Sequence, residues 1–271
     1  MNHEATSRRA ALGAMALLAM VLMTAEGLAS RPASTSLAAA ENPSCNRTVS
    51  SLAQPVGTGP CPGVRPGAMI LSDEGSCTMN FLFKGNDGRR YIGTAGHCIL
   101  AGNGEAVYKG RTGPEARDAD GNRIGRFAYA VLKAPKDFAL VRLDKGVKSD
   151  AQMCHFGGPT EINDDITTDT VVLEFFGNGL GIGSIPVANV PTLPARSAVA
   201  NGMPDPDHVS ALGAAAPGDS GSGINSEDGR AVGVVVTIGS NGIGITRIAP
   251  QLARAEKQLR VDLKLLTAPP N

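Results

Sequence analysis

The chain has 271 residues, 42 % of them hydrophobic, which is enough to bury one large β domain or two small barrels. Its 25 basic and 25 acidic residues give a formal charge of zero, so no net field attracts nucleic acid or an anionic membrane, and we expect no nucleic-acid partner. Glycine, at 34 residues, exceeds its usual share of about 7 %, a composition typical of many turns and short strands rather than of long helices.

Residues 1–29 have the features of a secretory signal peptide. Arg8 and Arg9 precede an uncharged apolar run at 10–23, and small residues follow it. The run is shorter than the ~20 residues that a membrane-spanning helix needs, although an uncleaved signal anchor is the alternative. We expect cleavage after Ala29, export to the extracellular or cell-envelope space, and no stable membrane insertion after the signal is removed.

Residues 30–66 are rich in Ala, Ser, Pro and Gly and have no period of 2 or 3.6, so we interpret them as a leader, propeptide or flexible arm outside the core. From residue 67 onward, short apolar runs alternate with turns. The runs 79–83 and 91–95 flank the turn sequence Gly-Asn-Asp-Gly at 85–88 and predict a hairpin. Further strands are predicted at 104–109, 123–130, 138–143, 171–176, 185–190, 230–237 and 242–248.

Two later segments complete the organisation of the chain. Residues 118–122, Asp-Ala-Asp-Gly-Asn, resemble the start of a calcium loop, but no glutamate closes it, so a hairpin turn is the better interpretation. After Pro250, apolar residues recur every three or four positions and predict an amphipathic helix over 250–266. The pattern therefore indicates an all-β protein with one terminal α-helix.

The five cysteines are an odd number, so in an oxidising space at least one of them stays free or bonds elsewhere. Their spacing includes no Cys-x-x-Cys and no His/Cys cluster of the kind that zinc needs. We expect no metal and no cofactor.

The strongest chemical signal is the segment 217–223, Pro-Gly-Asp-Ser-Gly-Ser-Gly, in which Ser220 lies close to three glycines. Glycines permit a tight turn that can direct the N–H groups of Gly218 and Ser220 at one point, where they would stabilise an oxyanion. The alternative interpretation is a plain Gly/Ser loop.

A serine hydroxyl needs an adjacent base to take its proton. Of the four histidines, His3 lies in the signal peptide, and His155 and His208 lie in turn-rich segments. His97 follows the end of a predicted strand, and Cys98 beside it can fix its position. His97 is therefore the candidate base.

The base needs an anion behind it to fix its tautomer. Asp137 directly precedes the apolar residues 138–141, where a carboxylate can be dry and oriented. Asp144, at the far end of the same strand beside Lys145, is expected to be solvated.

Three segments together resemble, in order and approximate spacing, the signature segments of the trypsin/chymotrypsin family of serine peptidases. They are Thr-Ala-Gly-His-Cys at 94–98, Asp-Phe-Ala-Leu-Val-Arg-Leu at 137–143 and Gly-Asp-Ser-Gly-Ser-Gly at 218–223. The short length and exported start look most like the bacterial secreted members. The resemblance covers about residues 68–266, although the motifs fix only a small part of that range.

The resemblance implies a peptidase domain over 67–266, built of two packed antiparallel six-stranded Greek-key β-barrels. The first barrel would span about 67–145 and the second about 165–248, with the helix at 250–266 after them. The activity it implies is endopeptidase hydrolysis of protein or peptide substrates by a monomer.

The resemblance also implies roles for individual residues. His97 would be the general base, Asp137 the carboxylate that orients it and Ser220 the nucleophile that becomes acylated. The N–H groups of Gly218 and Ser220 would form the oxyanion hole. Asp219 would pair with a buried cation that orders this turn.

In animal members of the family that cation is a new N-terminus released by cleavage. No Ile-Val-Gly-Gly or similar start precedes the first predicted strand here, which puts that activation route in doubt. An arginine would be a substitute, and the sequence does not say which one.

Cys77 and Cys98 match the family disulfide beside the catalytic histidine. The pairing of Cys45, Cys61 and Cys154 stays open, and a bond between Cys61 and Cys154 would tie the leader to the segment between the barrels.

The expected specificity pocket is placed by its spacing of six residues before Ser220. Ala214 lies where a trypsin-like enzyme has an aspartate, and Thr237, Ile238 and Gly239 would form the strand that pairs with the substrate backbone. Without a carboxylate at Ala214, we expect a preference for small or apolar side chains over Arg or Lys.

Other functions remain as alternatives. A catalytically silent member of the family would use the same body for adhesion or binding, although all three triad positions are present. A periplasmic stress protease carries a further peptide-binding domain, for which too few residues follow Gly223. A lipase would have the order Ser, Asp, His rather than His, Asp, Ser.

Overall fold

A computed structural model describes residues 60–163, 171–181, 194–201, 205–239 and 242–271. The predicted signal peptide, Cys45 and the predicted strand 185–190 lie outside these ranges. Within them, no helix is both long and apolar enough to cross a membrane.

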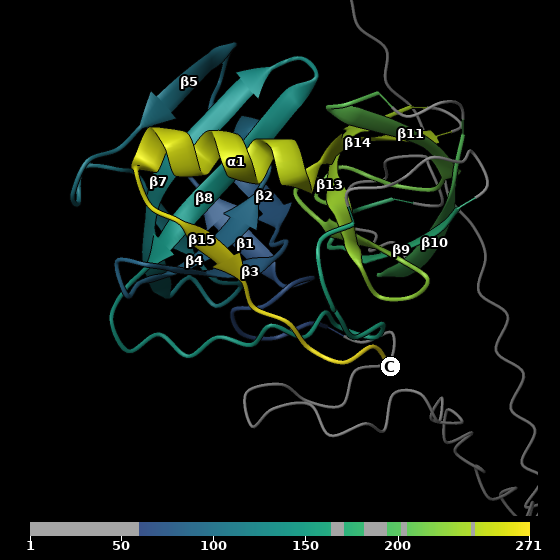
Figure 1. The fold of residues 1–271 in the computed structure, drawn as a ribbon, viewed down its shortest axis with the longest axis horizontal. Helices are drawn as coiled ribbons and strands as arrows, with labels where there is room; N and C mark the ends of the chain where they lie inside the picture. Colours follow the sequence, from purple (N-terminus) through teal and green to yellow (C-terminus); the bar gives the residue numbers. More distant parts are fainter. Residues whose placement is uncertain (1–59, 164–170, 182–193, 202–204, 240–241) are drawn as a thin grey trace, which may run out of the picture. The chain divides into compact units, whose positions relative to one another are not determined.

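The first half of the described chain forms one curved antiparallel sheet of nine strands, in the order β15-β3-β4-β8-β7-β6-β1-β2 with β5 on β7 (Figure 1). We call it the first sheet. The edge strand β15 comes from near the C-terminal end of the sequence. The strands are β1 (Met69–Ser72), β2 (Gly75–Thr78), β3 (Leu82–Gly85), β4 (Arg90–Thr94), β5 (Gly104–Val107), β6 (Glu115–Arg117), β7 (Arg123–Lys133), β8 (Lys136–Leu143) and β15 (Leu263–Leu265).

Aromatic side chains fill the core of the first sheet. Phe83 on β3, Phe127 on β7 and Phe138 on β8 are at most 1 % exposed. Strand β8 is buried without interruption from Asp137 to Val141, because one face lies against this core and helix α1 packs on the sheet as well. A strand covered on both faces has a continuous apolar sequence, which is the pattern seen at 138–141.

The second half is a closed barrel of six antiparallel strands, in the order β10-β11-β14-β13-β12-β9. We call it the second barrel. Leu173 and Phe175 of β9 point into its core, and Glu174 between them lies on the outer face. The strands are β9 (Val172–Phe176), β10 (Ala195–Ala200), β11 (His208–Gly213), β12 (Gly223–Ser226), β13 (Ala231–Ile238) and β14 (Gly242–Arg247).

Strand β13 joins the two bodies. Val232 and Val235 belong to the core of the second barrel, whereas Val234 and Val236 pack with the core of the first sheet. A β-bulge in the pairing with β14, between Val235 and Thr237, accompanies this change of face. Side chains of β13 therefore fill both cores, and the groove between the bodies lies beside its end.

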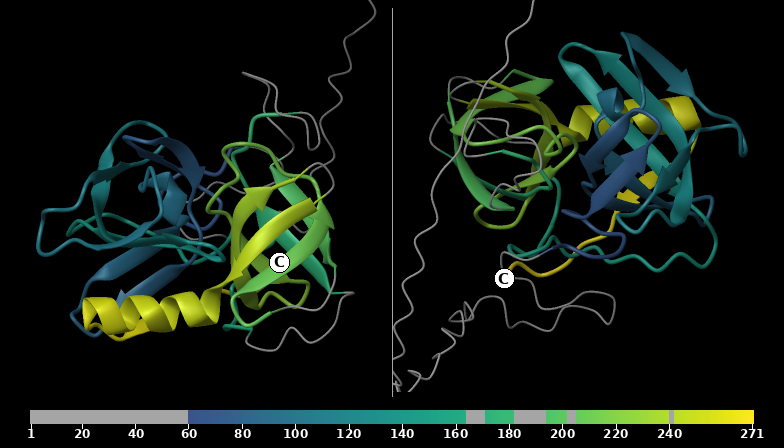
Figure 2. Two further views of the ribbon diagram at one scale, coloured as in Figure 1. Left: turned by 90° about the horizontal axis from the view of Figure 1, so that it is seen from above. Right: turned by 180° about the vertical axis from the view of Figure 1, so that it is seen from behind.

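The predicted terminal helix is shorter than expected. Helix α1 spans Ile248–Leu259 and lies against the first sheet (Figure 2). It ends because Arg260 adopts the left-handed conformation, with φ 56° and ψ 43°. Leu263 and Leu265 then form part of β15, which pairs with β3. The prediction of helix over 260–266 was wrong.

The segment 60–66, which the composition assigned to the leader, packs against the folded body. Cys61 forms a disulfide with Cys154. Arg65 is only 1 % exposed and donates hydrogen bonds from Nε and Nη2 to the carbonyl oxygen of Gln152, at 2.9 and 2.6 Å. The folded body therefore begins before residue 67.

Other predictions from the sequence agree with the structure. The fold is mainly β with one terminal helix, and the second barrel has the six strands predicted for it. The first body differs from the predicted six-stranded barrel: it is a half-barrel of nine strands, because β15 from the end of the chain and the short strand β5 add to it. Residues 118–122 form a turn, in which Oδ1 of Asp118 accepts the N–H groups of Asp120 and Asn122. That carboxylate oxygen serves its own backbone, in agreement with the turn interpretation.

Candidate active site

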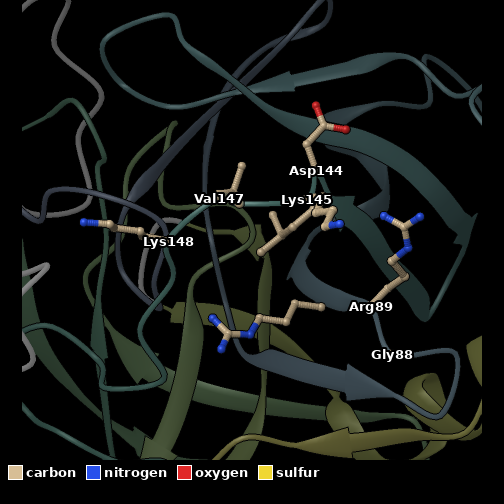
Figure 3. A pocket seen from close by; sticks show the side chains of 9 residues that line it. Gly88, Arg89, Asp144, Lys145, Val147 and Lys148 are labelled. Atoms are coloured by element: carbon tan, nitrogen blue, oxygen red, sulfur yellow. The ribbon is translucent and has the colours of Figure 1, made fainter.

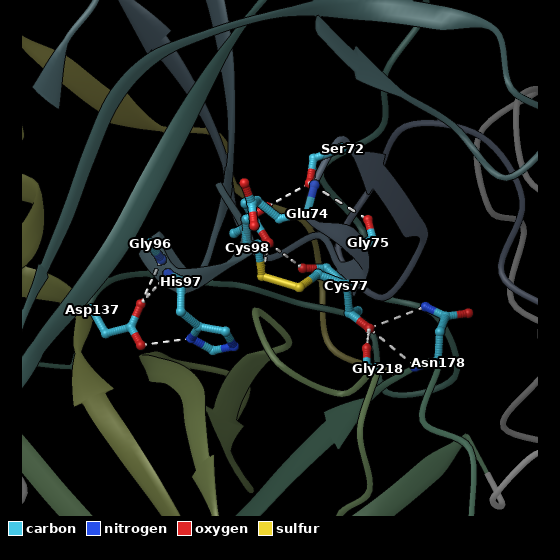
Figure 4. The surroundings of a disulfide bond; sticks show 12 residues. Ser72, Glu74, Gly75, Cys77, Gly96, His97, Cys98, Asp137, Asn178 and Gly218 are labelled. Carbon is cyan, nitrogen blue, oxygen red and sulfur yellow. Dashed lines mark hydrogen bonds and ion pairs between the residues drawn. A yellow bond between two sulfur atoms is a disulfide. The ribbon is translucent and has the colours of Figure 1, made fainter. Parts of the chain in front are cut away.

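His97 lies on a 3-10 turn, Gly96–Cys98, directly after β4. Cys98 of this turn forms a disulfide with Cys77 on β2, as the family resemblance implied (Figure 4). The side chain of His97 is 32 % exposed, so one edge of the imidazole faces solvent. His97 and the two sulfur atoms lie close together, but sulfurs in a disulfide are not thiolates and do not form a metal site.

Asp137 lies near the start of β8 and faces the turn that carries His97 (Figure 4). Its Oδ2 lies 2.7 Å from Nδ1 of His97. Its Oδ1 accepts the N–H groups of Gly96 at 2.5 Å and His97 at 3.0 Å. An ionised carboxylate only accepts hydrogen bonds, so Nδ1 carries a proton and Nε2 has a free lone pair. The imidazole is thus oriented as a base.

Gly96 permits the close approach between this turn and β7. A Cβ atom on Gly96 would lie 1.9 Å from the carbonyl oxygen of Val131, far inside any normal contact. Any larger residue here would force the turn, and His97 with it, away from Asp137.

We therefore expect Gly96→Ala to lower stability by about 1–3 kcal/mol, the usual cost of overpacking. A displacement of the imidazole by about 1 Å would lower kcat by about 10²-fold. Gly102→Ala is the matched control, because no atom lies within 4 Å of a Cβ there. Thermal melting and peptidase assays on both variants test this, and equal effects of the two changes would contradict it.

Ser220 lies on a tight turn between the end of β11 and the start of β12, held against the first sheet. Its carbonyl oxygen accepts the N–H of Thr78 at 2.8 Å. Gly221, with φ of +92°, packs so closely on Thr94 that a Cβ would lie 2.3 Å from the Thr94 hydroxyl. These contacts bring the serine turn beside the strand end that leads to His97.

Two N–H groups of this turn have no internal acceptor. Among the described residues, neither Gly218 nor Ser220 donates its backbone N–H to a hydrogen-bond acceptor, while those of Asp219 and Gly221 are bonded. The Ser220 hydroxyl also makes no hydrogen bond within the described part of the chain. Catalytic hydrogen bonds are often formed only in the substrate complex.

Asp219 is completely buried and forms an ion pair with Arg196 of β10. Both guanidinium Nη atoms bond its two carboxylate oxygens, and the N–H groups of Gly179 and Ala216 add bonds at 2.8 and 2.7 Å. The guanidinium lies over the ring of Phe175, 4.9 Å from its centroid. The turn that carries Ser220 is thus held by a cation from within the barrel.

Comparison with known proteins agrees with this geometry. The sequence model of the trypsin family matches residues 87–253, more than half of the chain. The chain belongs to the trypsin family. Membership of this family makes it a serine-type endopeptidase. No curated protein matches the sequence.

Two solved bacterial proteases share the fold of this trypsin-family chain. Protease A of Thermobifida fusca has a TM-score of 0.51 and 16 % identity, over 75 % of this chain and 98 % of its own. The Nocardiopsis protease has a TM-score of 0.51 and 16 % identity, over 74 % of this chain and 98 % of its own.

Arg196 is the functional residue that the sequence did not identify as the partner of Asp219. A signal was present, because Arg196 is the only lysine or arginine between Lys148 and Arg230. Thr78 was also missed. Its hydroxyl donates to the carbonyl oxygen of Gly218 at 2.8 Å and so fixes the orientation of that peptide, for which the sequence offers no signal.

The predicted substrate-binding strand is the end of β13. The N–H of Gly239 donates to the carbonyl oxygen of Gly242 at 2.8 Å, so it closes the hairpin and is not available to a substrate. Backbone groups alternate in direction along a strand, so those of Ile238 point away from β14, to the open edge. Thr237 is exposed and pairs with Gly244. Within this trypsin-family site, the open edge therefore belongs to Ile238 rather than to Gly239.

A cavity of about 310 Å³ adjoins the candidate triad, with Asp137 and Thr237 in its wall. Leu132, Pro135 and Val236 give it an apolar part, and the polar residues in its lining include Lys136, Asp205 and His208 of β11. Ala214 does not line this cavity and lies half-buried directly after β11.

A larger hollow of about 580 Å³ lies at the opposite end of β4 and β8 (Figure 3). Arg89 and Lys145 are among the four basic side chains that line it, and its only acid, Asp144, bonds Nε of Arg123 at 2.8 Å. The residues lining it include no serine, cysteine or histidine. It therefore offers neither the serine nucleophile nor the imidazole base that the proposed peptidase reaction needs.

Proposed function

We propose that this chain hydrolyses peptide bonds through a triad of His97, Asp137 and Ser220. The observation that carries the proposal is the 2.7 Å hydrogen bond between His97 and Asp137, beside a turn in which Ser220 is only partly buried. Membership of the trypsin family supports the same chemistry.

In the proposed mechanism, Nε2 of His97 takes the hydroxyl proton as Oγ of Ser220 attacks the substrate carbonyl carbon. The N–H groups of Gly218 and Ser220 receive the oxyanion that forms, and each such donor is typically worth about 10²–10³ in kcat. His97 then gives its proton to the leaving amine, and water hydrolyses the acyl-enzyme by the reverse sequence. Asp137 stays ionised and stabilises the imidazolium.

We propose a preference for small or apolar substrate side chains. Ala214 and its buried neighbours Ala215 and Ala216 offer no carboxylate to an Arg or Lys side chain. The apolar side chains of Leu132, Pro135 and Val236 in the cavity beside Asp137 support the same preference at a neighbouring substrate position. Cleavage of a peptide library by the purified protein measures both, and a dominant preference for Arg or Lys would contradict the proposal.

We also propose that the protein is exported. The signal-like residues 1–29 and the two disulfides support an oxidising compartment. N-terminal sequencing of protein recovered outside the cell tests the predicted cleavage after Ala29.

The decisive test of the proposed function is labelling with a fluorophosphonate, a probe that reacts only with an activated serine. We expect the label to map to Ser220 and to disappear in Ser220→Ala. Ser222→Ala, two residues along the same turn, is the matched control and should still be labelled, provided that melting shows it folded. A folded wild-type protein that takes no label would instead favour a silent binding member of the family.

A further inference from the structure

Three oxygen-bearing side chains share one patch on the outer face of the second barrel. Glu174 on β9 and Asn225 on β12 are direct cross-strand partners, which puts their Cβ atoms about 4.5–5.5 Å apart. The N–H of Glu227 bonds the carbonyl oxygen of Val172, so the same register continues. Asn225 therefore lies on the same face as Glu174, and the exposed Glu227, in the turn directly after β12, lines the same cavity.

This patch forms the wall of a cavity of about 240 Å³. The residues 155–156 of the segment between the two bodies and the residues 270–271 of the terminal segment cover it. A β-bridge between Gly157 and Pro270 joins these two segments to each other. Glu174 is only partly exposed as a result. Burial of the Glu174 carboxylate, together with the nearby charge of Glu227, raises the pKa of Glu174.

Asn225 adds an unsatisfied acceptor to this cavity. Its side chain is 1 % exposed, and its Nδ2 donates to the carbonyl oxygen of Gly157 at 3.2 Å. Its Oδ1 has no hydrogen-bond partner among the described residues. A buried acceptor without a partner costs about 1–3 kcal/mol unless something fills the position. Since Nδ2 is bound, Oδ1 is the atom of the amide that is left for a ligand.

No lysine or arginine of the described residues forms an ion pair with either carboxylate, and His155 is the basic residue that lines the same cavity. Neither Glu174 nor Glu227 has an ion pair among the described residues. From residue 149 to residue 229 the sequence has eleven acidic residues and one basic residue, Arg196, which is bound to Asp219. Among the described residues, the two carboxylates therefore have no lysine or arginine as a countercharge.

We propose that Glu174, Glu227 and Oδ1 of Asn225 bind a calcium ion. Carboxylate and amide oxygens are the ligands of hard cations, and calcium accepts six to eight of them in irregular geometry, with water completing the shell. Magnesium requires a near-ideal octahedron, which side chains from separate strands and a turn are less suited to supply. From the sequence we expected no metal, because no Cys or His spacing suits zinc and no glutamate closes the calcium-loop-like segment 118–122.

The test uses the full chain carrying Ser220→Ala, so that self-digestion does not interfere, and it does not depend on the proposed function. Calorimetric melting suits a chain without tryptophan. A dissociation constant of 10⁻⁴–10⁻³ M, as in extracellular modules, predicts that 10 mM calcium raises Tm by roughly 3–10 °C over sodium at equal ionic strength. Magnesium should raise it less.

Glu174→Gln and Glu227→Gln should each reduce the calcium shift to less than half. Glu161→Gln, an exposed acid on the same half of the chain, is the matched control and should keep the full shift. Asn225→Asp should melt lower in a chelator and show a larger calcium shift. Absence of any shift beyond that of sodium, or an equal loss in the Glu161 variant, would overturn the proposal.

Discussion

Asp137→Asn should lower kcat by about 10⁴-fold while the fold stays intact. The asparagine Oδ1 can still accept the N–H groups of Gly96 and His97, so the turn keeps its backbone bonds. Its Nδ2, however, would donate toward Nδ1 of His97 and force the proton of the imidazole onto Nε2. That nitrogen could then no longer take the proton of Ser220. Steady-state kinetics and melting of the purified variant measure the two effects.

Asp144→Asn is the matched control for this change. Asp144 directly follows the same strand, its carboxylate is 34 % exposed, and its ion pair with the exposed Arg123 is screened by solvent and contributes little to stability. The kcat of the Asp144→Asn variant should equal that of the wild type. If both variants kept full activity, Asp137 would have no part in the reaction.

Arg196→Gln should destabilise the protein and disable the serine turn together. The change leaves Asp219 buried with no cation, which typically costs 3–5 kcal/mol and corresponds to a fall in Tm of roughly 10 °C. A turn that relaxes around the unpaired carboxylate also misaligns the N–H groups of Gly218 and Ser220. We expect kcat to fall by at least about 10²–10³-fold, with reduced fluorophosphonate labelling.

Two further variants separate the ion pair from a general loss of structure. Arg230→Gln removes an exposed pair with Asp228 and should change Tm very little. The double variant Arg196→Met with Asp219→Asn leaves no unpaired charge at this position, so its Tm should recover relative to Arg196→Gln while its kcat stays low. Recovery of full activity in the double variant would show that the pair does not order the turn.

The fold could be predicted where burial leaves a simple pattern. The strands at 91–95 and 138–143 are apolar runs bounded by turns, and β4 and β8 are found there. Strand β10 (Ala195–Ala200) was missed because its alanine- and serine-rich sequence shows little contrast between its faces. The helix prediction extended too far because Leu263 fits a helical period as well as a strand, and only pairing with β3 decides between them.

In the candidate site, too, some residues could be predicted from the sequence and others could not. The sequence allowed His97, Asp137 and Ser220 to be proposed as the triad because each stands in a local motif. The same holds for Cys98 as a disulfide partner. The pairing of Asp219 with Arg196 depends on how β10 lies against the serine turn, which no local pattern encodes. The same holds for the open strand edge at Ile238, since a one-residue bulge in β13 changes which backbone groups face outward.

The bond between Cys61 and Cys154 makes a covalent ring of the intervening chain, and the ring contains strands β1 to β8 with the Cys77–Cys98 bond inside it. The segment 101–103 on this ring is exposed, where a protease is most able to cut. One cut there would leave both fragments attached to each other, with His97 on one and Asp137 on the other. Nicked molecules would stay assembled and would separate only after reduction.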